Sequence, residues 1–181
     1  EADNDFKTEN GLQDIVNAEQ KDRKYYYVTQ GDIALVDGVA TQQFTNTAMR
    51  LEDEDAKDAD GNQLYVQVFD ASANGGEGGM VNTSEKLINR GLKYTMNAQV
   101  KSQANSALAG TDWMVIRAQE GGTAVPSNIT THRAAVRTKA NEMCVAIDNA
   151  ADVDALAALY EYNDAEPPVR PLGEFPPPPS A

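Results

Sequence analysis

Short runs of apolar residues separated by polar turns predict β-strands in the first part of the chain. The runs 25–28 and 33–36 are rich in aromatic, β-branched and other apolar residues. They lead into Asp37-Gly38, a dipeptide that readily adopts the positive φ angles of a tight hairpin turn. We therefore predict that the chain returns as a second strand from Val39.

A second hairpin is predicted further along the same region. Residues 48–51 lead through an acidic connection to Asp60-Gly61-Asn62, and residues 64–69 follow with alternate side chains on two faces. Beyond them, residues 71–79 contain two glycine clusters and few side chains that could pack. We interpret this glycine-rich segment as a flexible linker and place the domain boundary there.

After the linker, the pattern changes to one that is typical of helices. Asn82 is a good helix N-cap, and Glu85 stands where it completes a capping box, so a helix is expected from there to about Ala109. Its apolar residues recur every four positions, which exceeds the 3.6-residue turn, so the stripe winds around the helix. Such a helix either contacts several neighbours or breaks near Gly91 or Asn97. The stripe consists of Ile88, Leu92, Met96, Val100, Ala104 and Leu108.

Three further helices complete the predicted helical module. They extend over 111–120, 127–149 and 152–162, and Gly121-Gly122 ends the first of them. Thr111 and Ser127 are the expected caps of the first two. The residues expected to form the core of the module are Trp113, Val115 and Ile116, with the stripes Ile129, Val136, Met143 and Ile147, and Val153, Leu156 and Leu159.

The two ends of the chain are poor in residues that could build a core. Residues 1–23 are polar with a few apolar anchors, so this segment is expected to dock on something else. Residues 166–181 contain seven of the eight prolines, four of them consecutive, which excludes a helix or a central strand. We expect an extended arm, either a free ligand peptide or an ordered strap across a neighbouring subunit.

These patterns together predict an α+β fold. A small antiparallel β-module is followed by a helical module and an extended Pro-rich arm at the C-terminal end. The expected segments are an N-terminal docking segment (1–23), a β-hairpin module (24–70), a Gly-rich linker (71–81), a helical module (82–165) and a Pro-rich arm (166–181).

Charge narrows the range of partners. The chain has 28 acidic and 15 basic residues and a net charge of -13, which argues against coating DNA or binding an anionic membrane. We expect no membrane span, since no apolar run approaches about 20 residues, and no signal peptide. Residues 1–60 carry a net charge of -9, residues 84–143 carry +4 and residues 144–181 carry -6. This alternation suits head-to-tail contacts between subunits, and solvated faces of one small protein are the equal alternative.

Residues that could carry chemistry are scarce. The single Cys144 excludes an internal disulfide and a Cys-rich zinc site, and it reads as a small core residue. The acidic run 52–60 suggests calcium, but an EF-hand loop that starts at Asp58 would place Phe69 at the twelfth, ligating position, so a solvated loop is favoured. His132 has no second imidazole and no nucleophile signature near it. We therefore expect no enzyme, no cofactor and no metal.

The sequence resembles one protein family over residues 105–162. This stretch contains Thr-Asp-Trp at 111–113 and Val-Pro at 125–126, and then Arg133 and Arg137 in an R-x-x-x-R spacing. The pattern resembles tail assembly chaperones and tail-fibre-associated structural proteins of tailed bacteriophages of the marine phage type. Residues 5–12 resemble, more weakly, the start of fibre-like virion proteins in the same phages. The resemblance implies a small helical domain, and the preceding β-module, which the usual proteins lack, indicates fusion to a structural component.

The resemblance and the charge pattern lead to one functional expectation. We expect a non-enzymatic virion protein of a tail fibre, neck or tail adaptor, made in the host cytoplasm and present in several copies. Its partners would be other copies of itself and neighbouring virion proteins, without a membrane, and its acidic charge argues against nucleic acid. The candidate assembly contacts are Trp113, Arg117, Arg133, Arg137 and Phe175.

Three alternatives remain open from the sequence. The first is a dissociable tail or tail-fibre assembly chaperone, and the second is a subunit of a cellular surface filament. An enzyme is the least favoured, and it would be tested by mutating His132 and Asp112.

Overall fold

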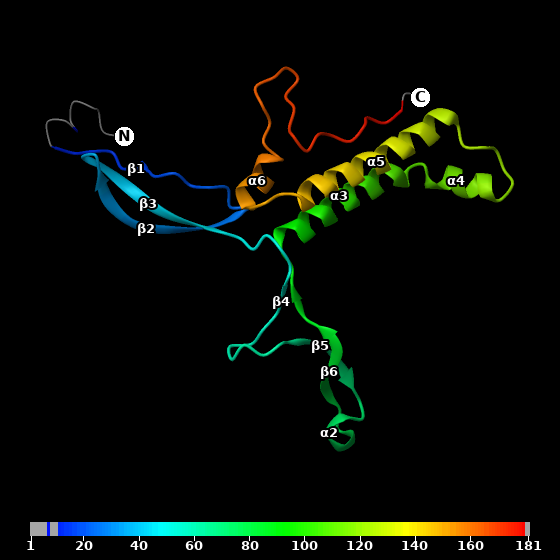
Figure 1. The fold of residues 1–181 in the computed structure, drawn as a ribbon, viewed down its shortest axis with the longest axis horizontal. Coiled ribbons are helices and arrows are strands. Elements are labelled where there is room, and N and C mark those ends of the chain that lie inside the picture. The colour runs from blue at the N-terminus through cyan, green and yellow to red at the C-terminus, as the bar shows by residue number, and fades with distance from the viewer. Residues whose placement is uncertain (1–6, 8–10, 180–181) are drawn as a thin grey trace. The chain divides into compact units, whose positions relative to one another are not determined.

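The chain is an α+β protein, as the sequence predicts: small antiparallel sheets are followed by helices (Figure 1). The computed structural model describes residue 7 and residues 11–179, so the prediction for 1–23 falls partly outside the described residues. The chain divides into two compact units, Glu1–Met49 and Arg50–Ala181. The division therefore lies before the acidic segment and not in the glycine-rich segment where the sequence analysis places it.

The first unit contains a three-stranded sheet with the strand order β1-β3-β2. Strands β2 (Tyr26–Val36) and β3 (Val39–Ala48) are antiparallel, and β1 (Val16–Asn17) runs parallel to β3. The backbone at Asp37 and Gly38 has φ angles of 50° and 79°. Both central residues of the turn thus have positive φ, which confirms the predicted Asp-Gly hairpin.

Little of this sheet is buried. Tyr25 and Tyr26 are its buried aromatic residues, at 3% and 6% exposure. Two polar residues of β3, Thr41 and Gln42, are also buried. The Gln42 amide donates to the carbonyl of Gly31, and its oxygen accepts from Gln30 at 2.9 Å. These bonds lie where the register of β2 against β3 shifts, between Gln30 and Ile33, so the polar side chain supports an irregular stretch of the ladder.

The second predicted hairpin is wrong in its pairing. Strand β5 (Tyr65–Asp70) pairs with β6 (Gly79–Lys86), and the helical turn α2 (Ala73–Gly76) lies at the tip between them. Residues 71–79 are therefore the end of a hairpin and not a linker. Gly75, Gly76 and Gly78 have φ angles of 75° to 99°, which residues with a Cβ rarely adopt, so the glycines allow the chain to reverse here.

The predicted helix start at Asn82 is also wrong. Asn82 and Glu85 belong to β6, in which Asn82 pairs with Gln67 of β5 and the Glu85 amide donates to the Thr83 hydroxyl. A short strand pair follows, β4 (Glu54–Asp55) with β7 (Ile88–Asn89), and helix α3 (Leu92–Ala109) begins after Gly91. A Cβ on Gly91 would lie 2.5 Å from the Leu51 and Glu52 carbonyl oxygens. Close packing of two backbones therefore fixes where the helix begins.

Helices α3 and α5 (Ser127–Asp148) pack side by side and form the core of the second unit (Figure 1). Helix α4 (Asp112–Gln119) connects them, and α6 (Val153–Ala158) follows, so all the predicted helices are confirmed with shifted ends. The Asp152 carboxylate caps α6 by accepting from the Ala155 amide at 2.7 Å. The buried residues of the pair are Leu92, Met96, Val100 and Ala104 of α3, and Arg133, Val136, Ala140, Met143 and Ile147 of α5.

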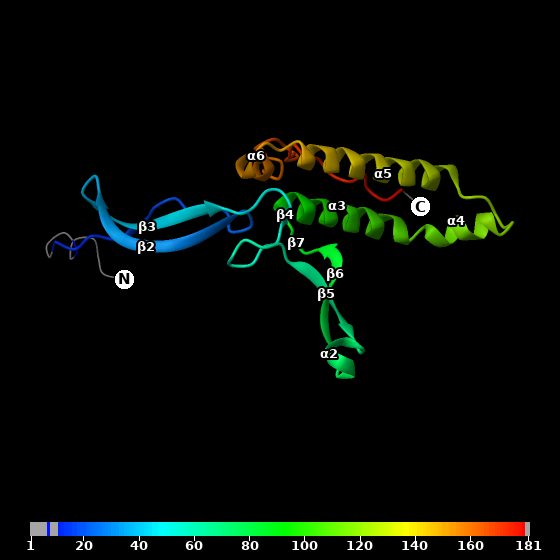
Figure 2. The same ribbon diagram turned by 60° about the horizontal axis from the view of Figure 1, so that its bottom comes forward.

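The described part of the Pro-rich arm contains neither helix nor strand, as predicted, but the chain turns between 163 and 173, and the arm lies on its own chain. Leu172 is 3% exposed, and its amide donates to the Leu159 carbonyl at 2.9 Å. Arg170 forms an ion pair with Glu174 at 2.7 Å, and Glu174 accepts from the Tyr162 hydroxyl. From there the arm runs back along α5 (Figure 2). In this structure the arm is thus a strap across its own α5.

Candidate interaction surfaces

The acidic segment 52–55 forms ion pairs with basic residues 86–93 of the same unit. Three of the bonds join residues that are 31 to 41 positions apart in the sequence, and the fourth is an i,i+4 pair. These acidic and basic residues, whose charges the sequence analysis assigned to contacts between subunits, therefore pair with each other within one chain. The pairs are Asp55–Lys86 (2.5 Å), Asp53–Arg90 (2.6 Å), Glu52–Lys93 (2.5 Å) and Glu54–Arg50 (2.8 Å).

Asp53 is the most constrained carboxylate of this cluster. One oxygen accepts from the Gly91 amide at 2.9 Å, and the other accepts from Arg90 at 2.6 Å. The Gly91 amide, followed by the Arg90 guanidinium, lowers the pKa of Asp53 below its ordinary value of 3.8. Asp53 thus fixes the residue at which α3 begins.

We expect low pH to weaken the hydrogen bond between the Asp53 carboxylate and the Gly91 amide. Because the folded pKa of Asp53 is depressed, its contribution is complete above about 3.8 and is lost as the pH falls through the lower folded value. We expect the Gly91 amide resonance in NMR spectra to stay in place down to about pH 4 and to move below it. In Asp53→Asn the resonance should be displaced already at neutral pH and lose most of its movement below pH 4. Asp60→Asn, a matched change in the exposed loop, should leave it unchanged, and a wild-type resonance that does not move in acid would contradict the assignment.

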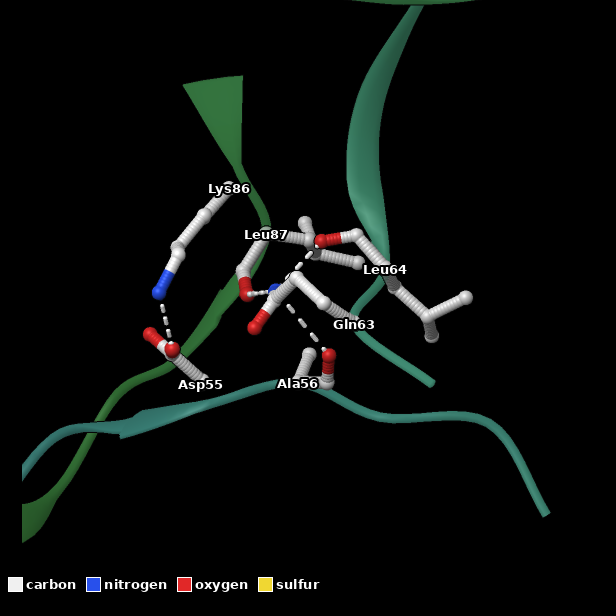
Figure 3. Close-up of polar contacts among 6 residues, drawn as sticks. All are labelled: Asp55, Ala56, Gln63, Leu64, Lys86 and Leu87. Carbon is white, nitrogen blue, oxygen red and sulfur yellow. Dashed lines mark hydrogen bonds and ion pairs between the residues drawn. The ribbon is translucent and has the colours of Figure 1, made fainter. Parts of the chain in front are cut away.

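A single amide side chain joins three backbone segments beside this cluster (Figure 3). The Gln63 amide nitrogen lies 3.1 Å from the Ala56 carbonyl oxygen, 2.5 Å from that of Leu64 and 3.3 Å from that of Leu87. A hollow of about 470 Å³ opens at the same place and is lined by residues 63–67, Asn82 and Leu87, none of them charged. No pattern in the sequence indicates this junction, because the partners of Gln63 are backbone carbonyl groups.

The acidic loop is organised by its own hydrogen bonds. The Asp58 carboxylate accepts from the backbone amides of Asp60 and Asn62, at 3.0 and 2.8 Å, and from the Asn62 side chain at 3.1 Å. These bonds lower the pKa of Asp58, the Asn62 side chain being the largest cause. Within residues 7 and 11–179, the structure places no three His, Cys, Asp or Glu side chains where they could hold a metal ion. The loop thus matches the solvated turn that the sequence favoured.

Arg133 is not available as an assembly contact. It is 7% exposed, and its guanidinium donates to the Leu108 carbonyl at 2.9 Å, to the Thr111 hydroxyl at 2.5 Å and to the Asp112 carboxylate at 2.7 Å. The guanidinium therefore donates to a carbonyl group at the C-terminal end of α3 and links α5 to the start of α4. The Thr-Asp-Trp motif and the first arginine of R-x-x-x-R have this structural role.

Helix α4 has no buried residue, so the prediction that Trp113 and Ile116 form core is wrong. Trp113 is 53% exposed and Ile116 is 58% exposed. Arg117 lies over the indole, with its guanidinium carbon 4.8 Å from the ring centroid. Arg137 is exposed, and Phe175 in the arm is half-buried. Four of the five candidate contacts thus remain accessible, and they lie on α4, α5 and the arm.

The largest exposed apolar residues of the first unit lie on the sheet. Leu35 and Val36 point to opposite faces of β2, and they are 76% and 45% exposed. Both faces are therefore uncovered near the turn. The other apolar side chains of β1, β2 and β3 that are more than 40% exposed are Val16, Tyr27, Ile33 and Val39.

The hairpin of β5 and β6 exposes a smaller apolar pair. Phe69 and Met80 are cross-strand partners and are 68% and 58% exposed. Residues that lie directly opposite each other share a face of the hairpin, so these two form a single patch. The Phe69 ring also lies close to Gly78, where a Cβ would approach it to 2.6 Å.

Cys144 is the remaining sequence candidate, and the structure does not favour a reactive thiol there. Burial raises the pKa of the Cys144 thiol, which opposes formation of the reactive thiolate.

Among the helices of the described residues, none is long and apolar enough to cross a membrane. Comparison with protein families, curated proteins and solved structures finds no match to the chain.

Proposed function

We propose that this protein is a structural component of a tailed-bacteriophage virion, in a tail fibre, neck or tail adaptor. It would act through protein-protein contacts and not through catalysis. The phage assignment rests on the resemblance over residues 105–162, a segment that contains the end of α3 together with α4, α5, α6 and their connections. The mode of action rests on the surface of the first unit.

The observation that carries the proposal is the open edge of β2. This strand has 11 residues and lies at the edge of the sheet, so among the described residues no strand lies beside its outward backbone groups. Protein edge strands are usually protected by lysine, proline, a bulge or short length, and of these β2 has only the irregularity between Gln30 and Ile33. Residues 26–48 contain no lysine, arginine or proline and two acidic residues. Such an edge suits addition of a strand from a neighbouring protein, with the exposed apolar side chains buried in the contact.

Mass spectrometry of purified particles tests the assignment. The protein should be present in intact virions at a fixed ratio to other tail proteins. If it is abundant in the infected-cell lysate and missing from washed particles, it is a dissociable assembly chaperone and the structural proposal is wrong. If the gene stands among those of a cellular filament, the phage assignment itself fails.

A charge placed on β2 should reduce incorporation. Leu35→Lys replaces a side chain that is 76% exposed, so the unfolding free energy should change by no more than about 0.5 kcal/mol. The lysine would oppose strand addition at the edge, and we expect several-fold less protein per particle. Val145→Lys, at a 58% exposed position on α5, is the control and should be incorporated normally. Equal incorporation of both variants would exclude the β2 edge as the attachment surface.

A further inference from the structure

We propose that the Trp113 surface of α4 binds the proline segment 176–179 of a second copy of this chain. The contact is separate from the β2 edge, so it stands or fails independently of the proposed virion role. In this arrangement the arm lies on its own α5 as far as Pro176. The prolines after Pro176 bind the second copy.

The Trp113 surface has the chemistry that binds a polyproline helix. Trp113, Ile116 and Arg117 are spaced i, i+3 and i+4, so they share one face of α4. An exposed indole offers a flat platform on which proline rings pack, as in aromatic grooves that bind Pro-rich peptides. The polyproline backbone makes no internal hydrogen bonds, so its carbonyl groups are free to accept from a neighbouring guanidinium. Arg117, stacked on the indole, carries such donors.

The arm supplies a ligand that loses little entropy on binding. Four consecutive prolines follow Phe175, and the backbone of residues 173–179 is in neither helix nor strand. Pro176 lines a hollow together with Ala135 and Thr138 of α5, whereas Pro177 and Pro178 are exposed. Because proline fixes φ, these exposed residues are already extended before they bind.

The position of the arm on α5 favours a second copy over the same chain. Successive residues of an α-helix are rotated by about 100°, so Ala135, Thr138 and Glu142 lie on one side of α5 and Arg133 on the other. Glu174 and Pro176 of the arm line a hollow on the first side. Arg133 faces the start of α4, next to Trp113. The arm therefore lies on the side of α5 opposite to the one that faces the α4 of its own chain.

Charge supports the same pairing. Residues 161–179 contain four acidic side chains and one basic side chain. In the part of the chain that the structure describes, no carboxylate forms an ion pair with Arg117 or Arg137. An acidic arm that approaches α4 from another copy would therefore meet cations that have no acidic partner. If two copies exchange their arms, both contacts form in one symmetric dimer.

Trp113 is the single tryptophan of the chain, so its fluorescence reports on this surface directly. We would follow emission and sedimentation of the full chain over a wide dilution series. The expected result is a weight-average mass that rises with concentration, together with a shift of Trp113 emission to shorter wavelength as prolines cover the indole. A synthetic peptide of residues 173–181, added in excess, should keep the emission shifted while it dissociates the copies.

Two pairs of variants, each with its own control, test the contact. Replacing Pro177, Pro178 and Pro179 together by serine, with Pro176 kept, should abolish the emission shift and the association, and Pro168→Ser should leave both unchanged. Trp113→Ala should lose association, whereas Trp113→Phe should retain most of it, with circular dichroism as the check on folding. A mass that stays monomeric at every concentration, or association that survives the triple proline variant, overturns the proposal. An emission shift that depends on the prolines but not on concentration would place the arm on its own Trp113 and also overturns it.

Discussion

Replacing Ile147 by alanine should lower the free energy of unfolding of the second unit by about 3 kcal/mol. Ile147 is 0% exposed and lies in the interface of α5 with α3. Truncation removes buried methyl groups and leaves a cavity, because the neighbouring helices cannot collapse fully into the space. The measurement is urea unfolding followed by circular dichroism at the helical band, which reports mainly on α3 and α5.

Val145→Ala is the matched control for this change. Val145 lies on the same helix and is 58% exposed, so its truncation should change the unfolding free energy by no more than about 0.5 kcal/mol. Equal losses in the two variants would mean that α5 does not pack on α3 through the Ile147 face. The contrast therefore tests the helix pair itself and not the helical propensity of α5.

The elements that the sequence predicted correctly depend on local patterns. Asp37-Gly38 specifies a tight turn whatever lies around it, and the flanking runs then pair with each other. The stripes of α3 and α5 follow the helical period, and Met96, Val100, Met143 and Ile147 are buried as that period requires. In these regions local preference and tertiary packing agree.

The errors arose where a local signal was compatible with two structures. Glycine clusters occur in flexible linkers and also in tight reversals, and the choice at 71–79 depends on β6, which pairs with β5. Asn82 and Glu85 fit a capping box in spacing, but Val81 and Thr83, which flank Asn82, are β-branched and favour a strand. The alternation of valine and threonine was the signal that could have corrected this prediction.

The candidate surfaces could be predicted only in part, because most of their contacts join distant residues. Asp53 and Arg90 are 37 positions apart, and Asp55 and Lys86 are 31 apart, so charge summed by segment could not show that they pair. Trp113 was expected in the core of the helical module, but α4 is a helix of eight residues with none of them buried. The structure thus places a large aromatic residue at a surface where the sequence expected packing.

Arg133→Ala should lower the free energy of unfolding of the second unit by about 2–3 kcal/mol. The change removes the charge-assisted bonds of the guanidinium to Thr111, to Asp112 and to the Leu108 carbonyl, which keeps the Thr111 amide and hydroxyl as donors at the end of α3. We also expect α4 to detach before the global transition, since these bonds hold its first turn against α5. Urea unfolding gives the stability, and hydrogen exchange at the amides of 112–116 gives the local opening.

The R-x-x-x-R spacing supplies an internal control for this prediction. Arg137 lies one turn further along α5 and is exposed, so Arg137→Ala should change the unfolding free energy by no more than about 0.5 kcal/mol. Arg133→Lys should fall between the two, because an ammonium group keeps the charge but cannot reach Leu108, Thr111 and Asp112 with the fixed fork of a guanidinium. If Arg133→Ala and Arg137→Ala were equally mild, the guanidinium would not be the tie between α5 and α4. The first arginine of the motif would then have to act on the surface, as the sequence alone suggested.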